Sequence, residues 1–584
     1  MKTRRLALAC IVLIGTGVAF GKYSGGTGEP NDPYRIATPT DLNDIGNHVE
    51  DFNKCFVMVN DVNLAGYTGD QFKIIGSSSN GFSGIFDGNG HSISNFTYTS
   101  LGTSAVGLFR AVGLPYYADG QIMNLTLIDA CLAGGDQVGA LVGLLFRGII
   151  QNCGVEGGNV SGGDYVGGLI GNGEEDFFGF RRISDCFSNA TVVGEGSVGG
   201  IVGSFSPVKG DAVISNCLTT GSVSGTDNVG GLVGYLESDI FSCHSSAAVS
   251  GDNYVGGLIG TARSLQHYQY YMDICDCNAS GNVSATGVYV GGLLGRNMDS
   301  NLADCRATGT VSGDGSVGGL IGGGGGNITR CCATGAISGQ GGTGGLLGAY
   351  SGGSITYSYA IGEVNSTDFG GGLVGYNEEG TVADCYAIGN VSGDLDCIGG
   401  LIGWNRGTIT RCFAIGEVRA VTSFFVGGLV GDNYQGAIIN SYATGAASGA
   451  AMVGGLVGAN SGDVTNCYAA GHVEGSDETG NLVGDSRRGA SYTKCFWDAD
   501  VNPDVNGIGN TSDPNVIGKT TVEMMKESTF TDAGWDFVEV WGIGENQTYP
   551  FLRVHSAGDL NHSGLVDWRD FAILAGHWLE GIEQ

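Results

Sequence analysis

The residues best suited to chemistry in this sequence are oxygen-bearing side chains spaced for a metal ion. Between Asp559 and Asp570 they fall at positions 1, 3, 5, 9 and 12 of a loop, with Gly564 at position 6. Hard cations require several converging oxygens, and this spacing wraps them around one point. We therefore predict that calcium is the cofactor, with an acidic turn as the alternative. The ligands would be Asp559, Asn561, Ser563, the backbone carbonyl of Leu565, Asp567 and Asp570.

A second set of candidate residues lies in three insertions of an internal repeat. The insertions at 172–184, 204–214 and 261–274 fall at the same point of their repeats, so stacking should place them on one edge. Aromatic rings beside arginine are typical of sugar or protein recognition. The candidate binding residues are Phe177, Phe178, Arg181, Arg182, Lys209, His267, Tyr268, Tyr270 and Tyr271.

A third candidate surface is an aromatic position that recurs in six successive repeats. It follows a small inward-facing residue, so the period of two expected for a strand points it outward. The resulting stack of rings either stabilises the sheet face or offers a platform for sugar rings or a partner. The residues are Tyr359, Tyr386, Phe413, Tyr442, Tyr468 and Phe496.

The 17 cysteines form a pattern that argues against a disulfide framework. Most occupy one place in successive repeats, where Ser358 and Ser441 replace two of them. In an in-register stack the Cβ atoms would be ~4.8 Å apart, longer than the ~3.8 Å of a disulfide. We predict a buried column of thiols, with some bridges or a metal site as alternatives. The column is Cys153, Cys186, Cys217, Cys243, Cys277, Cys305, Cys331, Cys385, Cys412, Cys467 and Cys495.

These residues must be positioned by a glycine-rich repeat that fills the middle of the chain. The hexad Val-Gly-Gly-Leu-Val-Gly or a near copy recurs mostly every 26 to 28 residues, and a second phrase, such as Cys385 to Val391, follows it. No repeat has ten to fifteen residues of helical periodicity, and each holds two or three short strand-like runs. The pattern predicts an all-β fold, a parallel β-helix of 13 to 14 coils. Parallel crossovers favour a right-handed path.

Capping and targeting segments are expected at the two ends. Arg4 and Arg5 precede an apolar run, as in a secretory signal peptide, and no other stretch is long and apolar enough to cross a bilayer. Thr38 and Thr520 are expected to begin short capping helices. The run from Asp498 to Asp504 is a weaker cation candidate. We expect a signal peptide at 1–21, an N-terminal cap and first coils at 22–105, the solenoid at 106–497, a C-terminal cap at 498–555 and the calcium-loop segment at 556–584.

The charge of the chain narrows the range of partners. It carries 58 acidic and 26 basic residues, a net charge of −32. Such a surface repels phosphate backbones and anionic membranes, so we expect no nucleic-acid partner.

The hexads, together with the Cys-Tyr-Ala-x-Gly phrase, resemble the GLUG-motif repeat proteins of bacteria over residues 24–553. That resemblance implies an exported solenoid, often surface-associated, and it transfers no catalytic motif. Residues 556–580 resemble one half of a type I dockerin, in which the oxygen ligands named above would bind calcium. A dockerin has two such loops and this segment one. The resemblance implies a cohesin-like or cell-surface protein as partner, in an assembly that acts on polysaccharide.

We therefore expect a secreted or cell-surface protein with a non-catalytic binding, adhesion or scaffold role, and carbohydrate or a surface protein as ligand. One alternative is a polysaccharide-active enzyme, which would need acids and bases clustered on one outer face. Asp304, Asp384 and Glu417 look dispersed instead. The other alternative is an inert structural spacer.

Overall fold

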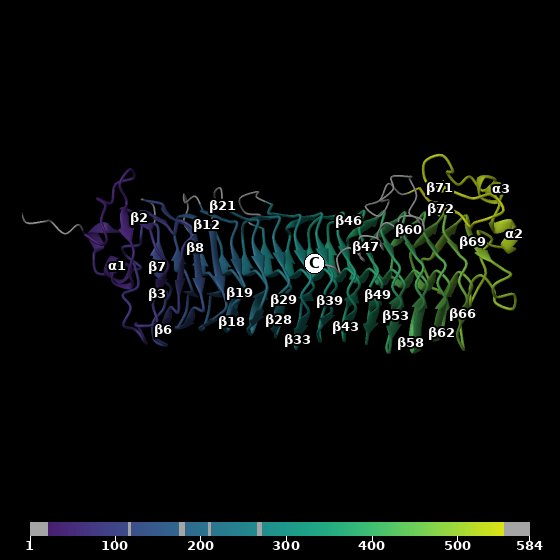
Figure 1. Cartoon of the computed structure of the whole chain (residues 1–584). Coiled ribbons are helices and arrows are strands. Elements are labelled where there is room, and N and C mark those ends of the chain that lie inside the picture. Colours follow the sequence, from purple (N-terminus) through teal and green to yellow (C-terminus); the bar gives the residue numbers. More distant parts are fainter. Residues whose placement is uncertain (1–21, 115–117, 174–180, 208–211, 265–270, 554–584) are drawn as a thin grey trace, which may run out of the picture.

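The structure is a computed structural model that describes residues 22–114, 118–173, 181–207, 212–264 and 271–553. They form one long β-solenoid, a rod of stacked coils with small helices near its two ends (Figure 1). The predicted signal peptide and the predicted calcium loop lie outside the described residues. Within them, no helix is long and apolar enough to cross a membrane.

Each coil contributes strands to three parallel sheets that run along the rod. In one representative coil, β50 (Val374–Asn377) belongs to a 14-stranded sheet, which we call the glycine face. Next, β51 (Thr381–Ala383) and β52 (Tyr386–Ala387) belong to a 32-stranded sheet, the cysteine face. Finally, β53 (Val391–Gly393) and β54 (Ile398–Gly399) belong to a 24-stranded sheet, the serine face.

The number of full coils equals the number of strands in the glycine face, because each full coil contributes one strand to it. Its 14 strands confirm the predicted all-β parallel solenoid and its coil number. They are β7 (Phe109–Val112), β11 (Val142–Leu145), β15 (Ile170–Gly173), β20 (Val202–Phe205), β25 (Val233–Leu236), β30 (Ile259–Arg263), β35 (Leu294–Met298), β40 (Ile321–Gly325), β45 (Leu347–Gly352), β50, β55 (Ile402–Asn405), β59 (Val430–Asn433), β63 (Val457–Asn460) and β67 (Val483–Ser486).

The hexad explains how the coils stack so closely. Leu373 and Val374 are fully buried in the core. A Cβ on Gly372 would overlap the carbonyl oxygen of Gly400 in the next coil, and one on Gly371 would overlap that of Val374. These glycines therefore permit close backbone approach inside the wall.

The cysteines form the predicted column of free thiols. All described cysteines are unbridged, and those of the column are at most 2% exposed. Each thiol donates to the carbonyl two residues before it, as from Cys217 Sγ to Ser215 at 3.3 Å. Some also accept from a backbone N–H of the preceding coil, as Cys243 Sγ does from Cys217 at 3.4 Å. The hydroxyl of Ser358 makes the same two bonds, which explains why serine can replace cysteine.

A second internal column, which the sequence analysis did not anticipate, consists of buried asparagines. Asn377, Asn405, Asn433 and Asn460 are fully buried, and each side-chain amide donates to the next side-chain carbonyl at 2.8 Å. Their remaining N–H groups donate to carbonyls of the following turn, as from Asn377 to Gly380 at 3.0 Å. The polar groups of the column are hydrogen-bonded to one another and to nearby carbonyls, so burying these amides costs little free energy.

The N-terminal cap has the predicted helix. Helix α1 (Pro39–Ile45) begins after Thr38, whose side chain forms a capping box with Asp41. A 3-10 helix, η1 (Val49–Asp51), follows. The cysteine face then extends through β1 (Tyr34–Ile36), β2 (Cys55–Met58), β4 (Ile85–Asp87) and β5 (Ser92–Ser94) into the first full coils.

The C-terminal cap has the predicted Thr520 capping box at helix α2 (Thr521–Met524), followed by α3 (Glu527–Thr531), β71 (Trp541–Gly542) and β72 (Phe551–Leu552). It packs against the side of the cysteine face as well as the last coil (Figure 1). The Asp498 carboxylate accepts from the Thr521 and Tyr549 hydroxyls. This carboxylate helps to hold the cap in place. The weaker cation site between Asp498 and Asp504 stays a prediction.

Candidate binding groove

The three predicted insertions begin from strands that are in register. Strand β15 pairs with β20 on the glycine face, and on the cysteine face β16 (Arg181–Ser184) pairs with β21 (Ala212–Ser215). Arg182 is exposed and Tyr271 is 59% exposed. Six of the named residues, Phe177, Phe178, Lys209, His267, Tyr268 and Tyr270, lie outside the described residues.

Arg181 does not lie on the outer surface where the sequence analysis put it. Its side chain is fully buried, and its Nε donates to the carbonyl of Phe146 at 2.7 Å. The alternation of β16 points Arg181 inward and Arg182 outward.

The predicted aromatic column exists on the cysteine face. From Tyr359 to Tyr468 neighbouring rings stack with centroids 4.9 to 5.1 Å apart and planes within 7°. In this arrangement each inner ring has both faces covered by its neighbours, whereas a sugar needs an open face. Tyr442, Tyr468 and Phe496 are at most 9% exposed and pack in one cluster with Trp535 and Trp541 of the cap. The geometry favours a stabilising role for this column.

Asp304 and Asp384 are also engaged by neighbouring coils. Each has a positive φ of 55° at the corner before a column cysteine, a conformation that aspartate tolerates well. Arg330 of the next coil binds Asp304 with two bonds of 2.7 and 2.6 Å, and Arg411 binds Asp384 in the same way. These carboxylates fasten one coil to the next.

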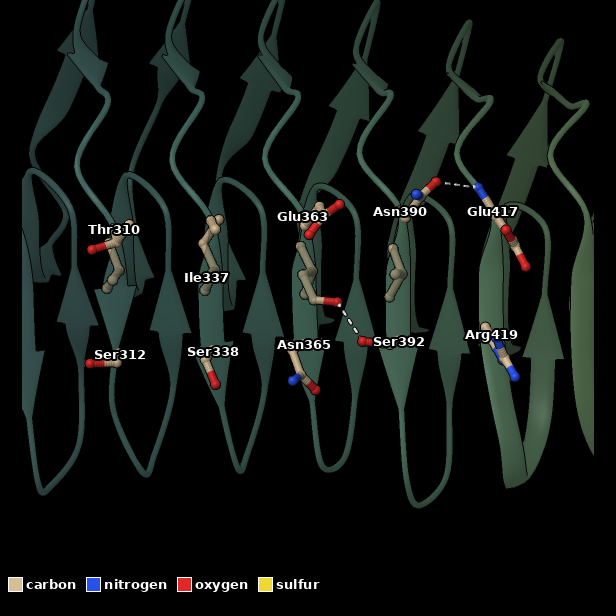
Figure 2. A pocket seen from close by; sticks show the side chains of 14 residues that line it. Thr310, Ser312, Ile337, Ser338, Glu363, Asn365, Asn390, Ser392, Glu417 and Arg419 are labelled. Atoms are coloured by element: carbon tan, nitrogen blue, oxygen red, sulfur yellow. Dashed lines mark hydrogen bonds between the residues drawn. The ribbon is translucent and has the colours of Figure 1, made fainter.

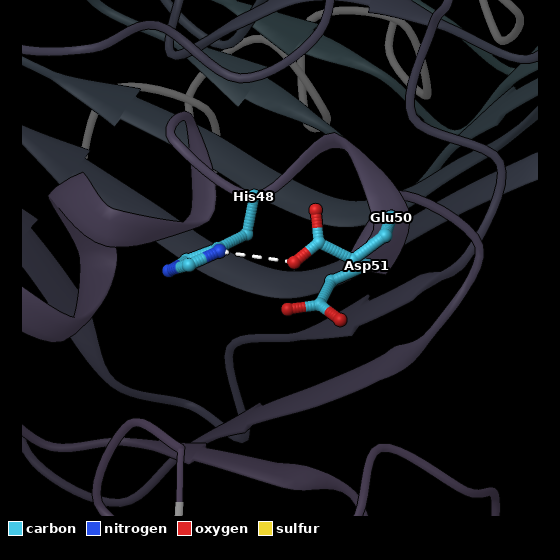
Figure 3. Close-up of side chains that lie close together, drawn as sticks. All are labelled: His48, Glu50 and Asp51. Carbon is cyan, nitrogen blue, oxygen red and sulfur yellow. Dashed lines mark hydrogen bonds and ion pairs between the residues drawn. The ribbon is translucent and has the colours of Figure 1, made fainter.

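One group among the described residues has metal-ligand chemistry, namely His48, Glu50 and Asp51 in the N-terminal cap (Figure 3). Lys22 takes the place that a cation would need, because its ammonium lies 2.9 Å from Glu50 and 2.5 Å from Asp51. That ammonium holds the pKa of Glu50 at about 2, well below its usual range. The group is therefore an ion-pair network of the cap.

A groove runs along the serine face. It consists of two adjoining hollows of about 500 and 680 Å³ that share Glu417 and Arg419. The groove crosses β38 (Val311–Ser312), β43 (Ile337–Gly339), β48 (Val364–Ser366), β53, β58 (Val418–Gly427), β62 (Ala447–Gly454) and β66 (Val473–Glu474). At ~4.8 Å per coil it is roughly 30 Å long.

Two rows of outward side chains line the groove (Figure 2). They flank an inward column of valines and isoleucines, because residues on either side of an inward residue point outward. Ser338, Asn365 and Ser392 are exposed and in register with one another. The first row is Ser312, Ser338, Asn365, Ser392, Arg419, Ser448 and Glu474, and the second is Thr310, Ala336, Glu363, Asn390, Glu417, Ala446 and His472.

The chemistry of the groove is that of polar recognition. Hydroxyls and side-chain amides both donate and accept, Arg419 adds a fork of donors, and Glu363 and Glu417 add strong acceptors. The two glutamates are exposed and separated by the coil that carries Asn390. Asn390 itself accepts from the backbone N–H of Glu417 at 3.0 Å.

The sequence analysis did not select these residues, apart from Glu417, which it took to be dispersed. A signal was available in the recurring Val-Ser-Gly triplet, whose serine alternates with the buried valine. Small polar residues resemble ordinary turn residues in a sequence. Only the stacking of coils shows that they form a continuous line.

A family model matches three parts of this chain. The GLUG motif model matches residues 286–312, 370–392 and 449–474, which include the groove strands β38 and β66. The chain therefore contains GLUG motif repeats, and they are built into a parallel β-solenoid.

Two curated relatives share parts of the chain. A protein of Evansella cellulosilytica, provisionally named a Gly-rich membrane protein, is 33% identical over 144 residues, which are 24% of this chain and 13% of that protein. Halomucin of Haloquadratum walsbyi is 33% identical over 138 residues, 22% of this chain and 1% of halomucin. The chain thus spans a small part of the length of both relatives.

A solved structure from Bacteroides ovatus, provisionally named an immunoglobulin A1 protease, aligns with 50% of this chain and 80% of its own. The TM-score is 0.36 and the identity 20%. We transfer no function from it.

Proposed function

We propose that this protein is an exported, non-catalytic binding solenoid that holds a linear polysaccharide in the serine-face groove. The observation that carries the proposal is the continuous polar groove across seven coils. A polymer with a regular repeat can make similar contacts with successive coils, because the wall itself repeats. Sugar hydroxyls match the hydroxyl, amide and carboxylate groups of the two rows.

Four further observations support an exported binding protein with a carbohydrate ligand. The first residues are predicted to be a signal peptide, and the relatives include halomucin and a protein named as a membrane protein. The net charge of −32 disfavours nucleic acid. The separation and exposure of Glu363 and Glu417 favour binding over hydrolysis, which needs two carboxyl groups acting on one bond.

The test is a glycan array with the mature chain, followed by binding measurements on groove variants. Ser392→Tyr places a ring in the groove and should reduce binding at least tenfold. Ser250→Tyr is the matched control, because Ser250 occupies the same row two coils before the groove and is equally exposed. Equal binding by both variants would remove the groove as the site. Release of reducing ends would instead favour a polysaccharide-active enzyme.

The C-terminal segment is proposed to bind calcium and to attach the rod to a cohesin-like or cell-surface protein. The support is the ligand spacing from Asp559 to Asp570. Calcium titration of the chelator-treated chain should give one site that the Asp559→Ala and Asp567→Ala variants lose. Unchanged calcium binding by both variants would refute the site without affecting the groove.

A further inference from the structure

The glycine face contains another hollow, of about 360 Å³, which lies over β40 and β45. One outward position in register along this face runs through Arg296, Gly323, Ala349, Tyr376 and Trp404. Two neighbouring coils therefore carry no side chain larger than a methyl where the flanking coils carry an arginine and an aromatic ring. The hollow is the space left by these two missing side chains.

A second position, at the corner seven residues before the outward position just described, is also occupied by small residues in these two coils. Tyr289 leans over the next coil, since a Cβ on Gly323 would meet its ring at 2.6 Å. In the next two coils the equivalent residues are Ser316 and Gly342, and a Cβ on Gly342 would lie only 3.6 Å from Cβ of Tyr376. Small residues in both positions keep the floor of the hollow open.

One end of the hollow presents an aromatic face. Tyr376 stacks on Trp404 with centroids 4.4 Å apart and planes 4° apart, so one ring face is covered. The opposite face is directed toward the coil of Ala349, whose methyl group cannot cover a ring. Phe369 meets Tyr376 at right angles, with centroids 5.9 Å apart. Unlike the inner rings of the cysteine face, Tyr376 has no second ring stacked on it from the next coil. An aromatic face favours ligands with an apolar face of their own, such as the C–H face of a sugar ring.

The other end presents a positive charge that is already held in place. The Arg296 guanidinium lies 5.5 and 5.6 Å from the ring centroids of Tyr254 and Tyr289. Among the described residues, no carboxylate lies within ion-pair distance of Arg296. A guanidinium fixed on aromatic rings binds a carboxylate with two parallel bonds at a small entropic cost. Two carboxylates, those of Asp299 and Glu378, also line the hollow and can accept from hydroxyl groups.

We propose that this hollow binds a short acidic sugar, a uronate of two units. One ring stacks on the open face of Tyr376, the carboxylate of the other pairs with Arg296, and hydroxyl groups donate to Glu378. The coils of Arg296 and Tyr376 are three apart, roughly 14 Å, which suits two linked rings. An aromatic acid would use Tyr376 and Arg296 but would leave the Glu378 carboxylate without a donor. The site lies on a different face from the serine-face groove and does not depend on it.

Calorimetric titration with a di-uronate and its carboxyl-reduced, neutral counterpart tests the proposal, in the presence of a chelator. The di-uronate should bind at least tenfold more tightly than the neutral sugar. Arg296→Gln should remove that preference. Ala349→Tyr should abolish binding and keep the melting temperature, because the new ring continues the stack of Tyr376 and Trp404.

The groove variant Ser392→Tyr is the control and should leave di-uronate binding unchanged. Retained binding by Ala349→Tyr, or a preference for the di-uronate that persists in Arg296→Gln, would overturn the proposal. Loss of binding in Ser392→Tyr alone would place the uronate in the groove, again contradicting it. If Ala349→Tyr does not fold, Arg296→Gln still decides the outcome.

Discussion

The cysteine face and the serine face are built from the same coils but differ in how their outer side chains are used. On the cysteine face, outer side chains of neighbouring coils contact one another. Rings stack from Tyr359 to Tyr468, and Arg330 and Arg411 bind aspartates of the preceding coil. On the serine face, Ser338, Asn365 and Ser392 are directed toward solvent in a hollow. Side chains already paired along the rod stabilise it, whereas exposed polar rows that line a groove remain available to a ligand.

The largest expected effect comes from breaking the aromatic column where the cap covers it. Tyr468 is 1% exposed, and its hydroxyl donates to the carbonyl of Pro550 at 2.6 Å. Tyr468→Ala should cost about 3 to 5 kcal/mol of unfolding free energy and loosen the cap. Hydrogen exchange and chemical denaturation would measure this. Tyr359→Ala, at the less buried end of the column, should cost clearly less, and equal costs would contradict the role of the cap.

Breaking the internal asparagine column should have the second-largest effect on stability. Asn405→Ala removes the acceptor of Asn377 and the donor to Asn433, leaving buried polar groups without partners. We expect a loss of about 2 to 3 kcal/mol in unfolding free energy. Asn365→Ala on the serine face is the control and should change it by less than about 0.5 kcal/mol. A similar loss in both variants would refute the distinction between inner and outer asparagines.

The thiol column should make stability fall at alkaline pH. Burial raises the pKa of Cys153 to about 12 and that of Cys495 to about 11. A raised folded-state pKa means that the folded chain holds protons that the unfolded chain releases above about pH 9. Each such thiol should reduce stability by about 1.4 kcal/mol per pH unit between its unfolded and folded pKa values. Denaturation at a series of pH values would measure the slope.

The same burial should protect the column thiols from reagents. Exposed Cys131 should react with a maleimide in the folded chain, whereas buried Cys153 should not. Rapid labelling of Cys153 without unfolding would contradict the structure.

The smallest effect on stability is expected from the groove. Ser392→Ala removes an exposed hydroxyl that lies 3.4 Å from the Val364 carbonyl, so unfolding free energy should change by less than about 0.5 kcal/mol. Affinity for a bound glycan should nevertheless fall severalfold. A variant that loses stability but not affinity would reverse the assignment of the two faces.

Much of the scaffold could be predicted because the period of the repeat is visible in the amino-acid sequence. The spacing of the hexads predicted a parallel solenoid, and the replacement of cysteine by Ser358 and Ser441 predicted unbridged thiols; both predictions are confirmed. The helix starts at Thr38 and Thr520 could also be predicted from the sequence, since a capping box depends on two residues three positions apart. The calcium loop remains a prediction.

The tertiary structure decided which surfaces are open. Arg181 and Arg182 are adjacent in the sequence, yet the first is buried and the second exposed. The rings from Tyr442 to Phe496 resembled an outer platform until the C-terminal cap covered them. The sequence alone determined the coil and its cysteine column, because these follow from local alternation repeated at a constant period. Grooves, hollows and covered faces depend on which coils become neighbours and where the cap folds back, and no single repeat contains that information.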